Sequence, residues 1–143
     1  MRKILMTIAI ALLLLTAACT DTPTGQAARK GTITIGYAGP LSGEAANWGL
    51  PMKKGFEYAL EEANGTVAGH NIKVVYEDTK CDPQEGLSAF NKLMTIDEAD
   101  IIAGTACSNV AHAVAQKTSK NDVWYIASGA TQPDVPELGD NIF

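Results

Sequence analysis

The stretch from Thr32 to Trp48, TITIGYAGPLSGEAANW, constrains the fold more than any other part of this chain. It begins with β-branched and aromatic residues, which favour a strand, and it breaks at Gly39-Pro40. The next regular pattern is a helix predicted over residues 50–64, where apolar residues recur at helical spacing. A strand that leads through small residues into a helix is the opening unit of a doubly wound α/β domain, in which ligands bind at the carboxyl ends of the strands. The loop 39–48 is therefore the first candidate for a functional site.

The rest of the chain repeats this alternation of strands and helices. The predicted strands are 71–78, 100–103 and 123–127, and the predicted helices run from 82 or 83 to 95 and from 110 to 119. Such alternation indicates an α/β fold with a parallel, Rossmann-like sheet, right-handed crossovers and helices on both faces. Trp124 lies inside a predicted strand, and we expect it in the core. Residues 140–143 look like the start of another strand, so we expect the chain to be a piece of a longer one.

Residues 1–18 predict a secretory signal peptide. Arg2 and Lys3 precede an apolar run over residues 4–15, and small residues follow it. The run is short for a membrane span, which needs about 20 residues, although an uncleaved N-terminal anchor is the alternative. Thr16-Ala17-Ala18-Cys19 resembles a bacterial lipobox, which implies a lipid on Cys19. Residues 19–31 are polar and predict a flexible tether.

The charge of the exported chain limits its partners. Removal of residues 1–18 leaves 9 of the 11 basic residues and all 16 acidic residues, a net charge near −7. This charge argues against nucleic acid binding, which needs a basic face. If Cys19 carries lipid, Cys81 and Cys107 remain, and an oxidising compartment favours a disulfide between them. Two separate buried thiols are the alternative.

The chain lacks the common signatures of enzymes. The loop after the first strand has neither the Lys-Ser/Thr of a P-loop nor a G-x-S-x-G nucleophile elbow, and it has no G-x-G-x-x-G. His70 and His112 have no partner at metal-ligand spacing, and we expect His112 at the surface or between helices. Asp78 and Asp82 flank Cys81 and are expected at a solvated loop edge. We therefore predict no enzymatic activity, no metal and no cofactor.

Small or hydroxyl residues follow three of the four predicted strands. They are Leu41-Ser42-Gly43, Ala106-Cys107-Ser108 and Ser128-Gly129-Ala130-Thr131. Strand ends of a parallel sheet meet at one edge, where small side chains let backbone groups approach a polar ligand and hydroxyls add hydrogen bonds. Ser108 lies where a helix begins, and free N–H groups there favour a carboxylate. The alternative is that these loops are tight turns and Ser108 is only an N-cap.

Five segments, in this order, resemble the solute-binding proteins of branched-chain amino acid ABC transporters, the type I periplasmic binding proteins. They are ITIGYAGPLSGEAANWG, EEANG, VVYEDTKCDPQEG, IIAGTACSN and IASGATQPDVPELGDNIF. That family has two α/β lobes with the ligand in the cleft between them. The resemblance implies that residues 32–143 are most of the N-terminal lobe, truncated, with the second lobe absent. One departure is the turn Gly65–His70, which is shorter than in the family.

The resemblance also implies roles for individual residues. Trp48 would cover the side chain of the ligand, and Ser108 would hold its carboxylate. The carbonyl of Gly129 would accept the ligand ammonium, and Thr131 would contact the ligand with its hydroxyl and N–H, with Ala130 in the same ligand-binding set. The acidic partner of the ammonium belongs to the second lobe. Cys81 and Cys107 match the family's disulfide.

The function implied is that of the extracytoplasmic solute-binding component of an ABC transporter, which captures branched-chain or related apolar amino acids for uptake. Its partners would be the small-molecule ligand and a membrane permease, and it would act as a monomer with a lipid anchor as its only membrane contact. Its place would be the periplasm or the outer face of the cytoplasmic membrane. The alternatives are a ligand-binding sensor domain and a binding protein for short amides, urea or aromatic acids.

Overall fold

The computed structural model describes residues 31–143. The predicted signal peptide, the predicted lipidation site Cys19 and nearly all of the predicted tether lie outside these residues. Within the described part of the chain, no helix has the length and apolar character that crossing a membrane requires.

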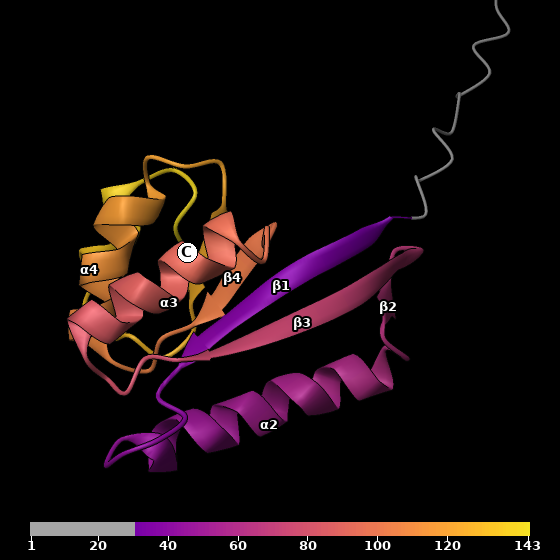
Figure 1. Cartoon of the computed structure of the whole chain (residues 1–143), viewed down its shortest axis with the longest axis horizontal. Coiled ribbons are helices and arrows are strands. Elements are labelled where there is room, and N and C mark those ends of the chain that lie inside the picture. The colour runs from indigo at the N-terminus through magenta and orange to yellow at the C-terminus, as the bar shows by residue number, and fades with distance from the viewer. Residues whose placement is uncertain (1–30) are drawn as a thin grey trace, which may run out of the picture.

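Five strands form one sheet in the order β2-β3-β1-β4-β5 (Figure 1). The strands are β1 (Thr32–Gly39), β2 (Thr66–Val67), β3 (His70–Asp78), β4 (Ile101–Gly104) and β5 (Trp124–Ala127). Gly39 lies opposite Asp78, Ala38 opposite Gly104, and Gly104 opposite Ala127. The carboxyl ends of all four parallel strands therefore reach the same edge of the sheet, as predicted.

The sheet is mixed, because β2 pairs with β3 in the antiparallel direction. A tight turn makes this hairpin possible, with positive φ angles at Ala68 (50°) and Gly69 (84°). A strand of two residues carries no periodicity, and for that reason the sequence pattern did not reveal it. The hairpin lies at the end of the sheet opposite the strand ends just described, so it does not affect the predicted site.

Helices cover both faces of the sheet, which confirms the predicted architecture. They are α2 (Ala46–Glu62), α3 (Pro83–Thr95) and α4 (Ser108–Thr118), followed by the short 3-10 helix η1 (Val135–Leu138). In Figure 1, α2 lies along one face, and α3 and α4 pack side by side on the other. The predicted start of α3 is confirmed: Asp82 is its N-cap and accepts the N–H groups of Gln84 and Glu85 at 2.8 and 3.0 Å.

The main core lies between the sheet and the pair α3 and α4. Phe90 and Tyr125 meet edge to face, with ring centroids 5.1 Å apart. Tyr125 is fully buried, and its hydroxyl forms a hydrogen bond with the hydroxyl of Thr105. Burial raises the pKa of Tyr125, so this phenol stays protonated. On the other face, Tyr37 packs against Phe56 of α2 and Tyr76 of β3.

The prediction that Trp124 belongs to the core is wrong. Its side chain is 54% exposed and stacks on Phe143, with ring centroids 5.4 Å apart. Side chains alternate along a strand, and Tyr125 points toward the core under α3 and α4. Trp124 and Ile126 therefore point to the opposite face, where α2 packs on β1 and leaves them exposed.

The last residues, where the start of another strand was predicted, lie beside β5 and form a single bridge rather than a strand. The N–H of Tyr125 donates to the carbonyl of Asn141 at 2.9 Å, and the N–H of Phe143 donates to the carbonyl of Tyr125 at 2.8 Å. Ile142 and Tyr125 form a parallel bridge. The side-chain amide of Asn141 adds hydrogen bonds to the carbonyls of Thr118, Asn121 and Val123. This segment continues the parallel order of the sheet.

Candidate functional site

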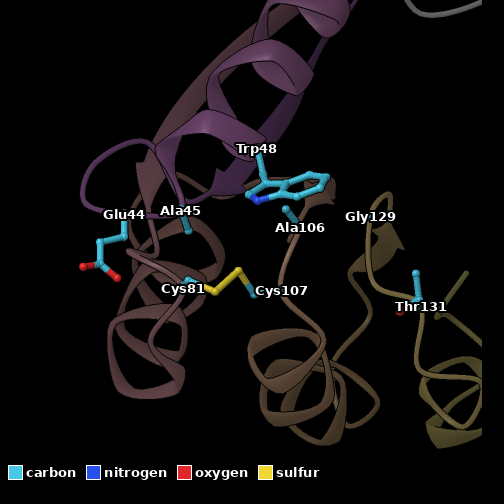
Figure 2. A pocket seen from close by; sticks show the side chains of 8 residues that line it. All are labelled: Glu44, Ala45, Trp48, Cys81, Ala106, Cys107, Gly129 and Thr131. Carbon is cyan, nitrogen blue, oxygen red and sulfur yellow. A yellow bond between two sulfur atoms is a disulfide. The ribbon is translucent and has the colours of Figure 1, made fainter.

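A pocket of about 460 Å³ lies at the carboxyl ends of the parallel strands. The segments that follow β1, β3, β4 and β5 all contribute to it. Its lining residues are Glu44, Ala45, Trp48, Cys81, Ala106, Cys107, Gly129 and Thr131 (Figure 2). This is the edge of the sheet that the sequence indicated, with the segment after β3 as a fourth contributor.

Trp48 lies on the first turn of α2 and not in a loop as predicted, because the helix begins at Ala46 and not near residue 50. The N-cap residue is Ala45, whose side chain cannot accept a hydrogen bond, so the sequence carries no capping signal at this helix start. The chain turns at Gly43, whose φ is 74°, and the N–H of Ala46 donates to the carbonyl of Gly43 at 3.2 Å. The indole of Trp48 is 68% exposed and lies across the pocket from the disulfide (Figure 2).

Close packing against the preceding loop holds this first turn in place. A Cβ atom on Gly49 would lie 1.9 Å from the carbonyl oxygen of Pro40, so only glycine lets α2 pass here. The hydroxyl of Tyr37 donates to the carbonyl of Gly49 at 3.2 Å. These contacts set the position of the neighbouring Trp48.

Ser108 and Thr131 come together from two different segments. The N–H of Thr131 donates to the hydroxyl oxygen of Ser108 at 3.2 Å. Ser108 is the first residue of α4, and Cys107 is its N-cap residue. The interpretation of Ser108 as only an N-cap is therefore wrong. Thr131 lines the pocket directly, whereas Ser108 is joined to it through this hydrogen bond.

Gly129 and Ala130 differ in their place. Gly129 lines the pocket, and a Cβ atom there would lie 3.0 Å from both the Cα atom of Ala106 and the Cε atom of Met52. The absence of a side chain at Gly129 therefore lets this segment pack against Ala106 and Met52, and it leaves the Gly129 backbone open to the pocket. Ala130 packs against the hydrophobic core and is not among the lining residues. Of the five predicted ligand-binding residues, Trp48, Gly129 and Thr131 line the pocket.

The predicted disulfide between Cys81 and Cys107 is present, with Cα atoms 5.6 Å apart. Both cysteines line the pocket, so the bond forms part of its wall (Figure 2). It joins the segment after β3 to the residue before α4. The side-chain amide of Asn109 adds a hydrogen bond to the carbonyl of Cys81 at 3.3 Å.

Asp82 is exposed as predicted, whereas Asp78 ends β3 and is only partly exposed. The carboxylate of Asp78 accepts the N–H groups of Leu41, Ser42 and Lys80 at 2.8, 3.3 and 2.9 Å, and it also accepts the hydroxyl of Ser42. Partial burial acts to raise the pKa of Asp78, but the hydrogen bonds from the Ser42 hydroxyl and from the three backbone N–H groups outweigh it. The net effect lowers the pKa of Asp78, so this carboxylate is ionised at neutral pH.

Two lining residues, Glu44 and Ala45, belong to the predicted candidate loop 39–48 but were not singled out within it. The predicted small residues 41–43 do not line the pocket, because Leu41 and Ser42 bind Asp78, and Glu44 and Ala45 take their place. Glu44 is exposed and is the one charged side chain among the lining residues.

The histidines lie apart from this pocket. His70 opens β3 in the hairpin. His112 lies on α4, and its Nε2 atom is 3.5 Å from a carboxylate oxygen of Asp134 in the segment before η1. Among residues 31–143, no three His, Cys, Asp or Glu side chains gather as metal ligands would.

Comparison with known proteins identifies the fold. Residues 32–143 match the family model described as "Periplasmic binding protein". The chain belongs to this family. This result agrees with the resemblance that the sequence motifs indicated. The pocket of this periplasmic binding protein chain lies at the strand ends of the described lobe.

The relatives of known structure named below hold two kinds of ligand. The chain is 34% identical over 114 residues to the Leu/Ile/Val-binding protein homolog 3 of Brucella melitensis, covering 78% of this chain and 31% of that protein. The substrate-binding protein LivJ of Streptococcus pneumoniae, in complex with isoleucine, has a TM-score of 0.73 and 32% identity, covering 78% of this chain and 33% of LivJ. A solute-binding protein of an ABC transporter from R. palustris, in complex with 4-hydroxybenzoate, has a TM-score of 0.73 and 27% identity, covering 78% and 30%. This periplasmic binding protein chain thus spans about a third of the length of these relatives.

Proposed function

We propose that this chain is the ligand-docking lobe of the solute-binding component of an ABC importer, and that it captures branched-chain or related apolar amino acids. The observation that carries the proposal is the convergence of Trp48, Gly129, Thr131 and the start of α4 on one pocket. An aromatic face, two polar segments and a helix N-terminus are the groups that an amino acid with an apolar side chain requires.

The hydrogen bond between Thr131 and Ser108 suggests how the ligand carboxylate is held. The hydroxyl oxygen of Ser108 accepts the N–H of Thr131, which leaves the O–H proton of Ser108 to donate to a carboxylate. The first N–H groups of α4 have no partner within the helix and favour the same negative charge. Each such charge-assisted hydrogen bond contributes about 1.5–3 kcal/mol.

The remaining groups would hold the other parts of the amino acid. The carbonyl of Gly129 and the hydroxyl of Thr131 would accept the ammonium, and the indole of Trp48 would cover the apolar side chain. An acidic residue of a second lobe would complete the ammonium site, since a charge buried without a partner is costly. The chain is proposed to be exported, anchored by lipid on Cys19, and to deliver its ligand as a monomer to a membrane permease.

An aromatic acid is the second candidate ligand. The R. palustris relative whose structure contains 4-hydroxybenzoate has the same TM-score as LivJ. Aromatic acids and amino acids share the carboxylate that Ser108 and α4 would bind, and the exposed face of Trp48 can stack on a benzene ring. The two candidates differ in the ammonium, so the polar groups of Gly129 and Thr131 distinguish them.

Calorimetric titration of the intact protein tests this proposal. The ligands are Leu, Ile, Val, Phe and 4-hydroxybenzoate, with acetamide and urea as controls. Ser108→Ala should weaken binding of the preferred acid by about ten- to a hundred-fold, at about 1.4 kcal/mol per decade. Ser88→Ala, which changes an exposed serine on α3 away from the pocket, is the matched control. Unchanged affinity in Ser108→Ala, or tighter binding of an amide than of any acid, would refute the assignment.

A further inference from the structure

One carboxylate connects two of the segments that line the pocket. Asp78 ends β3, and its side chain accepts hydrogen bonds from Leu41 and Ser42 in the segment after β1 and from Lys80 in the segment after β3. Asp78 itself is not a lining residue. Any effect that it has on a ligand must therefore pass through these neighbours.

The residues that Asp78 holds lead directly to the lining residues. On one side, Glu44 and Ala45 follow Ser42 after a single glycine, and the first turn of α2 with Trp48 comes next. On the other side, Cys81 follows Lys80. Both Lys80 and Cys81 have positive φ, 49° and 60°, a conformation that L-residues adopt only when their surroundings hold them there.

The chemistry of this contact suits an ionised carboxylate. Four donor groups converge on its two oxygens, and an ionised carboxylate offers acceptor sites on both. Three of these donors, the N–H groups of Leu41, Ser42 and Lys80, share Oδ1, and the Ser42 hydroxyl donates to Oδ2. An asparagine of the same shape would keep Oδ1 for the N–H groups, but it would remove the negative charge and place an NH₂ group against the Ser42 hydroxyl. Replacement by asparagine therefore changes the hydrogen bonding without leaving a cavity.

We propose that Asp78 is a positioning residue of the ligand site, which sets ligand affinity by holding the segment before Trp48 against the segment that carries Cys81. The proposal rests on the proposed function for its effect on affinity. Its effect on the position of Trp48 follows from the contacts alone, and the two effects can be measured separately.

The chain offers a matched control in Asp100. Its carboxylate accepts the N–H group of Thr34 in β1 at 2.8 Å, at the end of the sheet away from the pocket. Asp100→Asn and Asp78→Asn thus make the same chemical change to an aspartate that accepts backbone N–H groups, once far from the pocket and once beside it. If Asp78 served only general stability, both variants would lower the unfolding free energy and leave ligand affinity unchanged.

The experiment measures affinity, stability and the Trp48 indole N–H signal in NMR spectra of the intact protein. The probes are leucine and 4-hydroxybenzoate, and Trp48→Phe assigns the signal. Asp78→Asn should weaken the preferred acid about ten-fold, the loss expected for one charge-assisted hydrogen bond, while Asp100→Asn stays within about two-fold of wild type. The indole signal should shift or broaden in Asp78→Asn alone. Ser42→Ala, which removes one donor and keeps the carboxylate, should change both readouts in the same direction by less.

The possible results separate the two proposals. Wild-type affinity and an unchanged indole signal in Asp78→Asn would overturn the positioning role, as would equal losses in Asp78→Asn and Asp100→Asn. If the wild type binds neither acid, the proposed function fails, and the indole signal alone decides whether Asp78 positions Trp48. If Asp78→Asn does not fold, Ser42→Ala decides the question with the same readouts.

Discussion

The two walls of the pocket are held in different ways. One wall, which we call the core wall, consists of Cys81, Ala106, Cys107 and Gly129, and the other, the α2 wall, consists of Glu44, Ala45 and Trp48. The core wall is continuous with the buried residues Thr105 and Val110, and a disulfide runs through it. The α2 wall has no such support, because Gly49 is the one buried residue of α2.

The difference shows that a ligand would meet one wall fixed by burial and another held by a few specific contacts. The contacts of the α2 wall are the carboxylate of Asp78, the hydroxyl of Tyr37 and the approach of Gly49 to Pro40. Changes to the core wall should therefore reduce the stability of the protein. Changes to the α2 wall should act mainly on affinity and selectivity.

Loss of the disulfide should have the largest effect on stability. Replacing Cys81 and Cys107 by serine opens a loop with a sequence separation of 26, and the chain-entropy model then predicts a loss of about 3 kcal/mol. Urea unfolding of the oxidised wild type and the double variant measures this loss. Reducing agent should destabilise the wild type and leave the variant unchanged. Equal stability of both proteins would show that the core wall does not depend on the bond.

Two glycines of α2 should respond in opposite directions to alanine. Gly49→Ala places a methyl group against the backbone of Pro40 and should cost about 1–3 kcal/mol of stability as well as displacing Trp48. Gly55→Ala, the control on the same helix, meets nothing within 4 Å and should stabilise the protein by up to about 1 kcal/mol. Thermal unfolding and ligand titration measure both effects. A tolerated alanine at position 49 would mean that α2 is free to move away from the loop.

Removal of the Trp48 side chain should change selectivity more than stability. Because the indole is 68% exposed, Trp48→Ala should leave the unfolding free energy nearly unchanged. We expect it to shift the relative affinities for Leu, Ile, Val and Phe by about ten-fold, since it removes the apolar cover of the ligand side chain. Trp124→Ala, the control, removes an exposed tryptophan that does not line this pocket. Equal selectivity in both variants would remove Trp48 from the site.

Acid should weaken the α2 wall through Asp78. The folded-state pKa of Asp78 lies below its ordinary value of 3.8, so the stability that its hydrogen bonds contribute is complete above that value and is lost as the pH falls through the lowered pKa. The stability difference between wild type and Asp78→Asn should therefore be constant near neutral pH and should shrink below about pH 4. Unfolding free energies measured across this range provide the check. A difference that stays constant to the lowest pH would show that the charge of Asp78 is not what binds the loop.

Much of this fold follows from local patterns in the sequence. The alternation of apolar periods predicted the parallel strands and the three helices, and Asp82-Pro83 predicted the start of α3 to within a residue. The small residues after the strands indicated the correct edge of the sheet. These predictions succeed because periodicity and capping depend on neighbours within one turn or one strand.

The start of α2 and the environment of Trp124 required the tertiary structure. The first turn of α2 forms against Pro40, where the fit depends on an absent Cβ and not on a capping residue. Trp124 has the pattern of a core residue, yet whether its face is covered depends on where a helix from another part of the chain lies. A strand pattern shows which side chains share a face, but it does not show what packs on that face.

By itself, the sequence determined the α/β architecture, the edge of the sheet where a ligand would bind, and a pair of cysteines suited to a disulfide. Only the tertiary structure decided which residues form the walls of the pocket and how each wall is held. Asp78 shows the physical reason. Its hydrogen-bond donors at Leu41 and Ser42 lie 37 and 36 positions earlier in the chain, and no local pattern links a carboxylate to donors that only the packing of the sheet brings to it.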